Sequence, residues 1–199
     1  MDVITRAEPV TWLFAGDSIV QGARWTDGAR GYAELFTERV RYELGRRMDA
    51  VINTGVSGWR ATDLAEHLER AVLHHRPDVV LVGVGVNDSQ AGAGGLTAFA
   101  EVLSGIVSRV RQAGALVVLQ TPVPVLPEAP PERVKWFAPY AQSVRDVAAG
   151  QETVLVDHAA HWAAHADRSW YGDPTHPNAA GHREMARTLL KIVEGAQPE

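Results

Sequence analysis

Short apolar runs rich in β-branched residues alternate along the chain with longer segments in which apolar residues recur every three or four positions. Runs of the first kind are typical of buried strands, and segments of the second kind are typical of helices that bury one side. Because the two kinds alternate, the pattern predicts an α/β fold, in which helices cover both faces of a parallel sheet. The expected strands are Thr11–Ala15, Ala50–Asn53, Val79–Val84, Leu116–Gln120 and Thr153–Val156. The expected helices are Tyr32–Arg47, Ala61–His75, Leu96–Gln112, Pro131–Ala149 and a last one from about Asn178 to Val193, ended by Gly195.

Composition places the chain among ordinary globular proteins and excludes several classes of partner. The 199 residues are 46% hydrophobic and 22% charged, which is enough for one domain, residues 1–199, around one core. The net charge is -5 and the basic residues are scattered, so we expect no binding to nucleic acid or to an anionic membrane. The chain has no cysteine, which excludes disulfides, thiolate metal sites and a cysteine nucleophile.

The N-terminal residues contain no basic segment followed by an apolar stretch, and no run of about eighteen apolar residues occurs in the sequence. We therefore expect a soluble, cytoplasmic protein, or a secreted one if a signal peptide has been removed from it. The sequence gives no indication of the oligomeric state.

Four polar motifs follow the expected strands or precede the last helix. In an open parallel sheet, ligands bind beyond the carboxyl ends of the strands, where the loops converge. Segments far apart in the sequence are therefore expected to meet at one place. The motifs are Gly16-Asp17-Ser18, Asn53-Thr54-Gly55-Val56-Ser57-Gly58, Gly85-Val86-Asn87-Asp88 and Asp173-Pro174-Thr175-His176-Pro177.

These motifs contain the parts of a nucleophilic triad, although Ser18 taken alone is equally well explained as a helix cap. A hydroxyl becomes a useful nucleophile only when a base takes its proton and a third group orients that base. Ser18 offers the hydroxyl and His176 the base, and a turn beginning at Asp173 brings its carboxylate back against the imidazole. The expected donors to the oxyanion are the N–H groups of Ser18 and Gly55 and the side-chain amide of Asn87.

Taken together, the four motifs resemble those of the SGNH hydrolases, also called GDSL-type esterases and lipases, in order along nearly the whole chain. The matching segments are F-A-G-D-S-I-V-Q-G, N-T-G-V-S-G, G-V-N-D and D-P-T-H-P-N-A-A-G-H. The resemblance implies a flavodoxin-like three-layer α/β/α sandwich with a five-stranded parallel sheet. It also implies Ser18 as nucleophile, His176 as base, Asp173 as its partner, and an oxyanion hole from Ser18, Gly55 and Asn87. The chain departs from the pattern at Gly58-Trp59-Arg60 and at Pro174-Thr175, which puts substrate preference in question and leaves the reaction type intact.

Other polar residues of the motifs have simpler explanations. Ser57 is a rival nucleophile, but a glycine follows it at once, so the spacing fails the G-x-S-x-G pattern. We expect it to be a loop hydroxyl that supports the backbone of Gly55. Asp17 and Asp88 are expected to accept hydrogen bonds from loop N–H groups, and His182 to act as a packing or capping group on the last helix.

Neither a metal site nor a nucleotide site is predicted. His158, His161 and His165 are spaced to share one helix face, but they lack the H-E-x-x-H pattern and nearby Cys or Glu ligands. Solvated helix histidines are therefore expected. The segment 83–87 begins like a dinucleotide fingerprint but lacks the third glycine. We expect a reaction that needs no metal or organic cofactor.

Aromatic residues near the motifs indicate the kind of substrate. Trp25, Trp59 and Trp170 lie in or beside the converging loops, where they either line the cleft and stack on a sugar or pad the loop bases. The proline-rich stretch Thr121–Pro131 is expected to be a stiff loop that walls one side of the cleft. We expect a serine ester hydrolase that acts through an acyl-enzyme on a small-molecule ester with a short acyl group, such as an acetylated sugar. The alternatives are a lysophospholipase or thioesterase, and a binding module in which the triad is unused.

Overall fold

The computed structural model describes residues 6–165 and 167–194, and its centre is a sheet of five parallel strands in the order β2-β1-β3-β4-β5. The predicted fold class is confirmed, and each strand lies within one residue of its predicted bounds. Because the three central strands are buried on both faces, their apolar runs are nearly continuous, which makes them easy to recognise in the sequence. The strands are β1 Thr11–Gly16, β2 Ala50–Asn53, β3 Val79–Gly83, β4 Leu116–Gln120 and β5 Val154–Val156.

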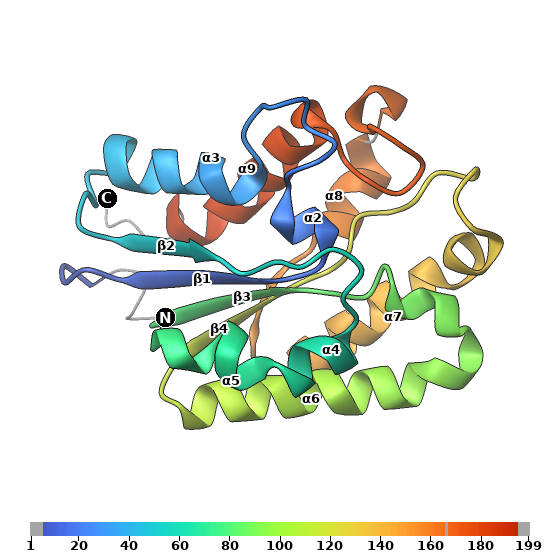
Figure 1. Ribbon diagram of the computed structural model, residues 1–199, viewed down its shortest axis with the longest axis horizontal. Coiled ribbons are helices and arrows are strands. Elements are labelled where there is room, and N and C mark those ends of the chain that lie inside the picture. Colours follow the sequence, from blue (N-terminus) through green and yellow to red (C-terminus); the bar gives the residue numbers. More distant parts are fainter. Residues whose placement is uncertain (1–5, 166, 195–199) are drawn as a thin grey trace.

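Helices cover both faces of the sheet (Figure 1). Trp12 and Phe14 of β1 belong to the core on one face, and Leu13 and Ala15 belong to the core on the other, because successive side chains of a strand point to opposite faces. The first face carries α3 (Tyr32–Glu38), α8 (His158–His165) and α9 (Ala179–Glu194). The second carries α4 (Ala61–Glu66), α5 (Leu68–Ala71), α6 (Leu96–Gln112) and α7 (Pro131–Gly150).

Two of the predicted helices are interrupted. The one expected over Tyr32–Arg47 passes into a π-helical turn, Arg39–Glu43, and ends before Gly45, whose φ of 75° is left-handed. The one expected over Ala61–His75 divides into α4, α5 and a short 3₁₀ turn. Its apolar stripe is nevertheless buried, since Leu64 and Leu68 are both inaccessible to solvent.

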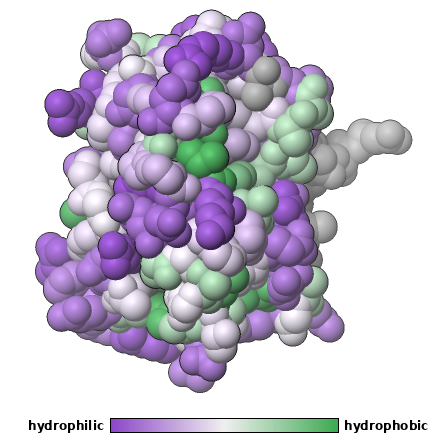
Figure 2. All heavy atoms as spheres, turned by 90° about the vertical axis from the view of Figure 1, so that its right-hand side faces the viewer, coloured by the Kyte–Doolittle hydropathy of each residue, from purple (hydrophilic) through white to green (hydrophobic). Residues whose placement is uncertain are grey.

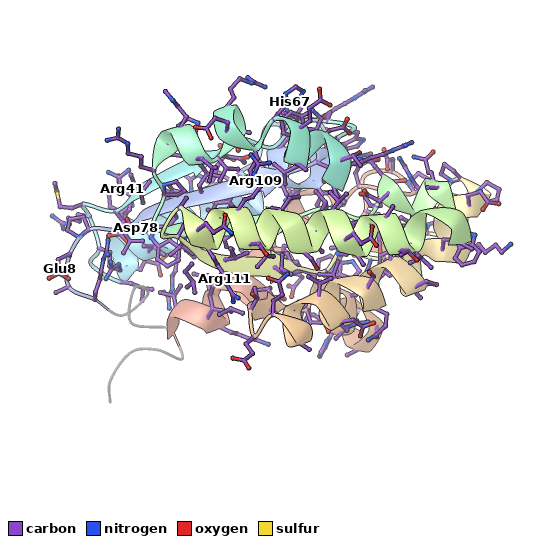
Figure 3. All side chains as sticks on the ribbon, turned by 90° about the horizontal axis from the view of Figure 1, so that it is seen from below. Glu8, Arg41, His67, Asp78, Arg109 and Arg111 are labelled. Carbon is purple, nitrogen blue, oxygen red and sulfur yellow. The ribbon has the colours of Figure 1, made fainter. Side chains whose placement is uncertain are left out.

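The two longest helices, α6 and α7, were predicted correctly to within one residue. Side chains of α6 connect it to its neighbours on either side: Arg109 donates to the carbonyl of Ala65 in α4 at 3.0 Å, and Arg111 to the carbonyl of Gln151 after α7 at 2.6 Å (Figure 3). The last helix, α9, begins after Asn178, whose Oδ1 accepts from the N–H groups of the first turn. Gly195, the predicted end of this helix, lies outside the described residues.

Candidate active site

The chain places Ser18 at the carboxyl end of β1, as the first residue of the short helix α2 (Ser18–Gln21). Asp17 is the N-cap of this helix, and its Oδ1 accepts from the Ile19 N–H at 2.9 Å. Capping by Asp17 leaves the Ser18 side chain free for another role, so the cap that Ser18 alone suggested is provided by its neighbour. Among the described residues, the Ser18 N–H forms no hydrogen bond.

Two glycines are required for this arrangement because the backbone segments lie close together. A Cβ on Gly16 would lie 2.0 Å from the carbonyl oxygen of Gly83 in the adjacent strand β3. A Cβ on Gly55 would lie 2.6 Å from the backbone nitrogen of Gln21 and 3.0 Å from the carbonyl oxygen of Asp17. Only glycine therefore allows the loops after β1, β2 and β3 to pack this closely around the serine.

Asp173 and His176 form the local pair that the sequence predicts. Oδ1 of Asp173 accepts from the backbone N–H groups of Thr175 at 2.7 Å and His176 at 2.8 Å, which closes the turn. The Nδ1 of His176 lies 2.8 Å from Oδ2 and 2.9 Å from Oδ1 of the same carboxylate. Desolvation raises the pKa of Asp173, but the hydrogen bonds from Thr175 and His176 outweigh this effect and bring the pKa below its ordinary value. The carboxylate is therefore ionised at neutral pH.

The three groups meet as a continuous chain of hydrogen bonds. The Oγ of Ser18 lies 2.9 Å from Nε2 of His176, across 158 positions of sequence. Because the Asp173 carboxylate can only accept, Nδ1 carries a proton, and Nε2 of the neutral ring is left to accept from the serine hydroxyl. Burial lowers the pKa of His176 below its ordinary value, against the hydrogen bond to Asp173, which raises it. The neutral form, which can act as a base, is thus favoured near neutral pH.

Trp25 stacks directly on the imidazole of His176. The two ring centroids are 3.4 Å apart and the planes differ by 6°. A Cβ on Gly172 would lie 3.1 Å from Cβ of Trp25, so this glycine lets the loop of Trp25 approach the loop of the base. Trp25 is half-buried and covers one face of the ring.

The three expected oxyanion donors differ in the hydrogen bonds that they already form within the protein. Within the part of the chain that the structure describes, the Ser18 N–H donates to no other group, and Asn87, in the loop after β3, is 6% exposed. The Gly55 N–H, in contrast, donates to Oδ1 of Asn53 at 2.9 Å. A role for Gly55 toward an oxyanion, which stays a prediction, therefore requires this N–H to be shared with a second acceptor.

The structure also places the other two tryptophans expected at the cleft. Trp59 is half-buried, lines a hollow together with Gly55, and stacks on His67 with ring centroids 5.5 Å apart. The ring of Trp170 packs edge-on against Trp162 of α8 at 5.1 Å and over His161. Trp170 therefore pads the loop base, which was the alternative explanation, whereas Trp25 lies against the catalytic base and a substrate-lining role for Trp25 and Trp59 stays a prediction.

The simpler explanations for Asp17, Asp88 and His182 are confirmed. Asp88 accepts from the Ala61 N–H at 2.9 Å, at the start of α4. His182 accepts from the Tyr32 N–H at 3.2 Å and so caps α3, a different helix from its own. Burial raises the pKa of Asp17 to about 7 and that of Asp88 to about 6, and it lowers the pKa of His182 to about 4.

Two expectations about side chains near the site are wrong. Ser57 does not support Gly55; its hydroxyl donates to Oε1 of Gln21 at 2.6 Å on the surface. His158 of α8 is not solvated but fully buried, within hydrogen-bond distance of Gln120, and burial lowers its pKa to about 3. His161 pairs with Glu184 on α9, and within the described residues no three potential metal ligands come together.

Two further segments contribute to the site: Asn53, whose role was not predicted from the sequence, and the proline-rich loop, which was predicted to wall one side of the cleft. Asn53 holds α2 in place, because its Nδ2 donates to the carbonyl of Val20 at 2.8 Å while its Oδ1 binds Gly55. The proline-rich loop after β4 is joined to the loop of the base by two hydrogen bonds, from Leu126 N–H to the Pro174 carbonyl and from the Tyr171 hydroxyl to the Pro124 carbonyl, both at 2.7 Å. It thus forms one wall of the site.

The face at the carboxyl ends of the strands is mostly hydrophilic, with small apolar patches separated by polar side chains (Figure 2). Within the described residues, every helix is too short or too polar to cross a membrane.

Comparisons with known proteins agree with this geometry. The family model described as GDSL-like Lipase/Acylhydrolase family matches residues 14–184. An acetylxylan esterase of Geobacillus stearothermophilus is 26% identical over 207 aligned residues, covering 91% of this chain and 92% of that protein. A crystal structure of an acetyl xylan esterase superposes with a TM-score of 0.79 at 24% identity, covering 92% of this chain and 100% of the other. A crystal structure of an acetylxylan esterase from Geobacillus stearothermophilus gives a TM-score of 0.77 at 22% identity, with coverage of 97% and 96%.

Proposed function

Since the chain belongs to the GDSL-like lipase/acylhydrolase family and is an ester hydrolase of the SGNH type, we propose that it removes short acyl groups, acetyl above all, from carbohydrate esters. The observation that carries this proposal is the chain of hydrogen bonds from Ser18 Oγ through His176 to Asp173. It supplies a nucleophile, a base and an orienting carboxylate at the place where the loops converge.

The reaction proceeds in two halves through an acyl-enzyme. Ser18 Oγ attacks the ester carbonyl and its proton passes to Nε2 of His176, which gives a tetrahedral intermediate with a negative oxygen. The Ser18 N–H, the Asn87 amide and the shared Gly55 N–H donate to that oxygen. When the intermediate collapses, the sugar oxygen leaves with the proton from Nε2. Water then attacks the acyl-serine by the same route, with His176 again as the base, and the acid and free Ser18 are released.

Three features support a short acyl group on a polar substrate. Trp25 covers one face of the base, and its indole offers the kind of surface on which sugar rings stack. The surrounding face is mostly hydrophilic, and its apolar patches are separated by polar side chains, which suits a polar substrate better than a long acyl chain (Figure 2). The similar proteins named above are described as acetylxylan esterases.

The test compares chromogenic esters of increasing chain length and acetylated xylooligosaccharides, with wild type, Ser18→Ala and Ser57→Ala. We expect p-nitrophenyl acetate to be hydrolysed faster than the octanoate, acetate to be released from the oligosaccharide, and Ser18→Ala to lose nearly all activity. Ser57→Ala is the matched control, because its hydroxyl donates to Gln21 at the surface, and it should keep wild-type activity. Faster cleavage of the octanoate or of a lysophospholipid would favour a lipase-type role.

A binding module with an unused triad is the other alternative, since a fold does not guarantee activity. Equal and slow rates for wild type and Ser18→Ala on every ester would support it and refute the proposed function. Bound acetylated oligosaccharide in calorimetry, without release of acetate, would then identify the module.

A further inference from the structure

The side chain of Arg133 joins two of the loops that form the site. Arg133 lies in the first turn of α7, directly after the proline-rich loop. Its Nη2 donates to Oδ1 of Asn87 at 2.7 Å, and its Nη1 donates to Oγ1 of Thr175 at 3.2 Å. Thr175 lies between Asp173 and His176. One guanidinium thus connects the amide expected at the oxyanion with the turn that holds the base.

The donors of this guanidinium are almost all occupied by the protein. With its amide oxygen toward Arg133, Gln90 accepts from Nε at 3.2 Å and from Nη2 at 2.8 Å. Together with Asn87 and Thr175, these contacts use four of the five N–H groups of the side chain. The acceptors are all neutral, and no carboxylate among the described residues forms an ion pair with Arg133. A fork used in this way is suited to holding other groups in place, since little of it remains for a ligand.

The amide of Asn87 is fixed from both ends. Its Oδ1 accepts from Arg133, and its Nδ2 donates to the carbonyl oxygen of Trp59 at 3.0 Å. An arginine can only donate and a carbonyl can only accept, so turning the amide by 180° would place donor against donor and acceptor against acceptor. The observed orientation is therefore strongly preferred, and the second N–H of Nδ2 has no acceptor among the residues that the structure describes.

We propose that Arg133 is a positioning residue that holds the Asn87 amide with its N–H side toward the oxyanion. The inference rests on the proposed function, in which Asn87 is an oxyanion donor. Without the guanidinium, only the Trp59 carbonyl still orients the amide, so the turned state, in which the amide oxygen would face the negative oxygen of the intermediate, becomes more populated. Arg133 therefore stabilises the transition state, in which the carbonyl oxygen becomes negative, and not the bound substrate. Its removal lowers kcat and leaves KM nearly unchanged.

The test is a double-mutant cycle on p-nitrophenyl acetate with Arg133→Met, Asn87→Ala and both together. We expect Asn87→Ala to lower kcat by about 10²- to 10³-fold, as for loss of one oxyanion donor. Arg133→Met should lower kcat by about 10- to 100-fold in the wild type but by less than about 3-fold when Asn87 is already alanine, because the amide it positions is gone. Lys135→Met is the matched control, since it removes a charge from the same helix turn at an exposed position, and should leave kcat unchanged.

Arg133→Lys separates positioning from charge alone, because a lysine keeps the charge but lacks the planar fork. We expect it to recover less than about one tenth of the lost kcat. Full recovery by lysine, an unchanged loss of kcat in the Asn87→Ala background, or a rise in KM at constant kcat would each overturn the inference. If Ser18→Ala keeps wild-type activity, both the proposed function and the inference about Arg133 fail. If Ser18→Ala and Asn87→Ala are impaired and Arg133→Met is not, only the inference about Arg133 fails.

Discussion

Replacing Asp173 with asparagine should abolish most activity while leaving the fold intact. The asparagine oxygen can take the place of Oδ1 and keep the two N–H donors of the turn, at 2.7 and 2.8 Å. Its NH₂ group would then take the place of Oδ2, 2.8 Å from Nδ1 of His176. A donor facing Nδ1 favours the tautomer with its proton on Nε2, so Nε2 donates to the Ser18 hydroxyl oxygen and can no longer take the proton of that hydroxyl.

The expected loss in kcat is about 10⁴-fold, which corresponds to about 5 kcal/mol of activation free energy. The assay is hydrolysis of p-nitrophenyl acetate together with thermal unfolding followed by circular dichroism. Asp173→Asn should keep Tm within about 2 °C of wild type, whereas Asp173→Ala, which also removes the acceptor of the turn, should lower Tm by about 2 to 4 °C for each kcal/mol lost. An asparagine variant that keeps more than one tenth of wild-type kcat would refute the tautomer argument.

Three other predictions concern pH and packing. The plot of log kcat/KM against pH should fall on the acid side with a midpoint below the ordinary 6.5 of histidine, because burial lowers the pKa of His176; a midpoint above 7 would contradict this. Burial raises the pKa of Asp17 to about 7, so the wild type loses stability as the pH rises from about 4 through 7 and this carboxyl ionises. Asparagine does not titrate, so the Tm of Asp17→Asn should lie further below that of wild type at pH 5 than at pH 8. Gly16→Ala should be destabilised by more than about 3 kcal/mol in urea unfolding, since its Cβ would lie 2.0 Å from the Gly83 carbonyl oxygen. The helical control Gly105→Ala, with open space around its Cβ, should gain up to about 1 kcal/mol of stability. Equal stabilities for the two glycine variants would show that the strands can separate to admit the methyl group.

The sheet could be predicted from the sequence because each buried strand is a short, nearly continuous apolar run. The interruption of the helix expected over Ala61–His75 could not. Its apolar period continues without a break through His67 and Val72, where the backbone leaves the helical conformation. Hydrophobic period records which side chains face the core, and it does not record whether the backbone hydrogen bonds between them are continuous.

The triad could be predicted because its members have distinct chemistry and lie directly after the first strand and directly before the last helix. The hydrogen-bond partners of the remaining groups could not be predicted, because they depend on distances of a few tenths of an ångström between distant segments. The Gly55 N–H binds Asn53, and Arg133 has no sequence signal at all, since a single arginine in the first turn of a helix is typical of a solvated surface. The stacking of Trp25 on His176 likewise depends on how two loops pack.

The hydroxyl and the imidazole come from nearly opposite ends of the chain, whereas Asp173 and His176 are a local pair. The first strand and the turn before the last helix must therefore both have reached their final places before a single ester bond can be cleaved. After dilution from denaturant, esterase activity consequently cannot return before these two distant segments are in contact, so the rate of its return reports their association. A colorimetric ester assay can therefore be used to follow this long-range step of folding.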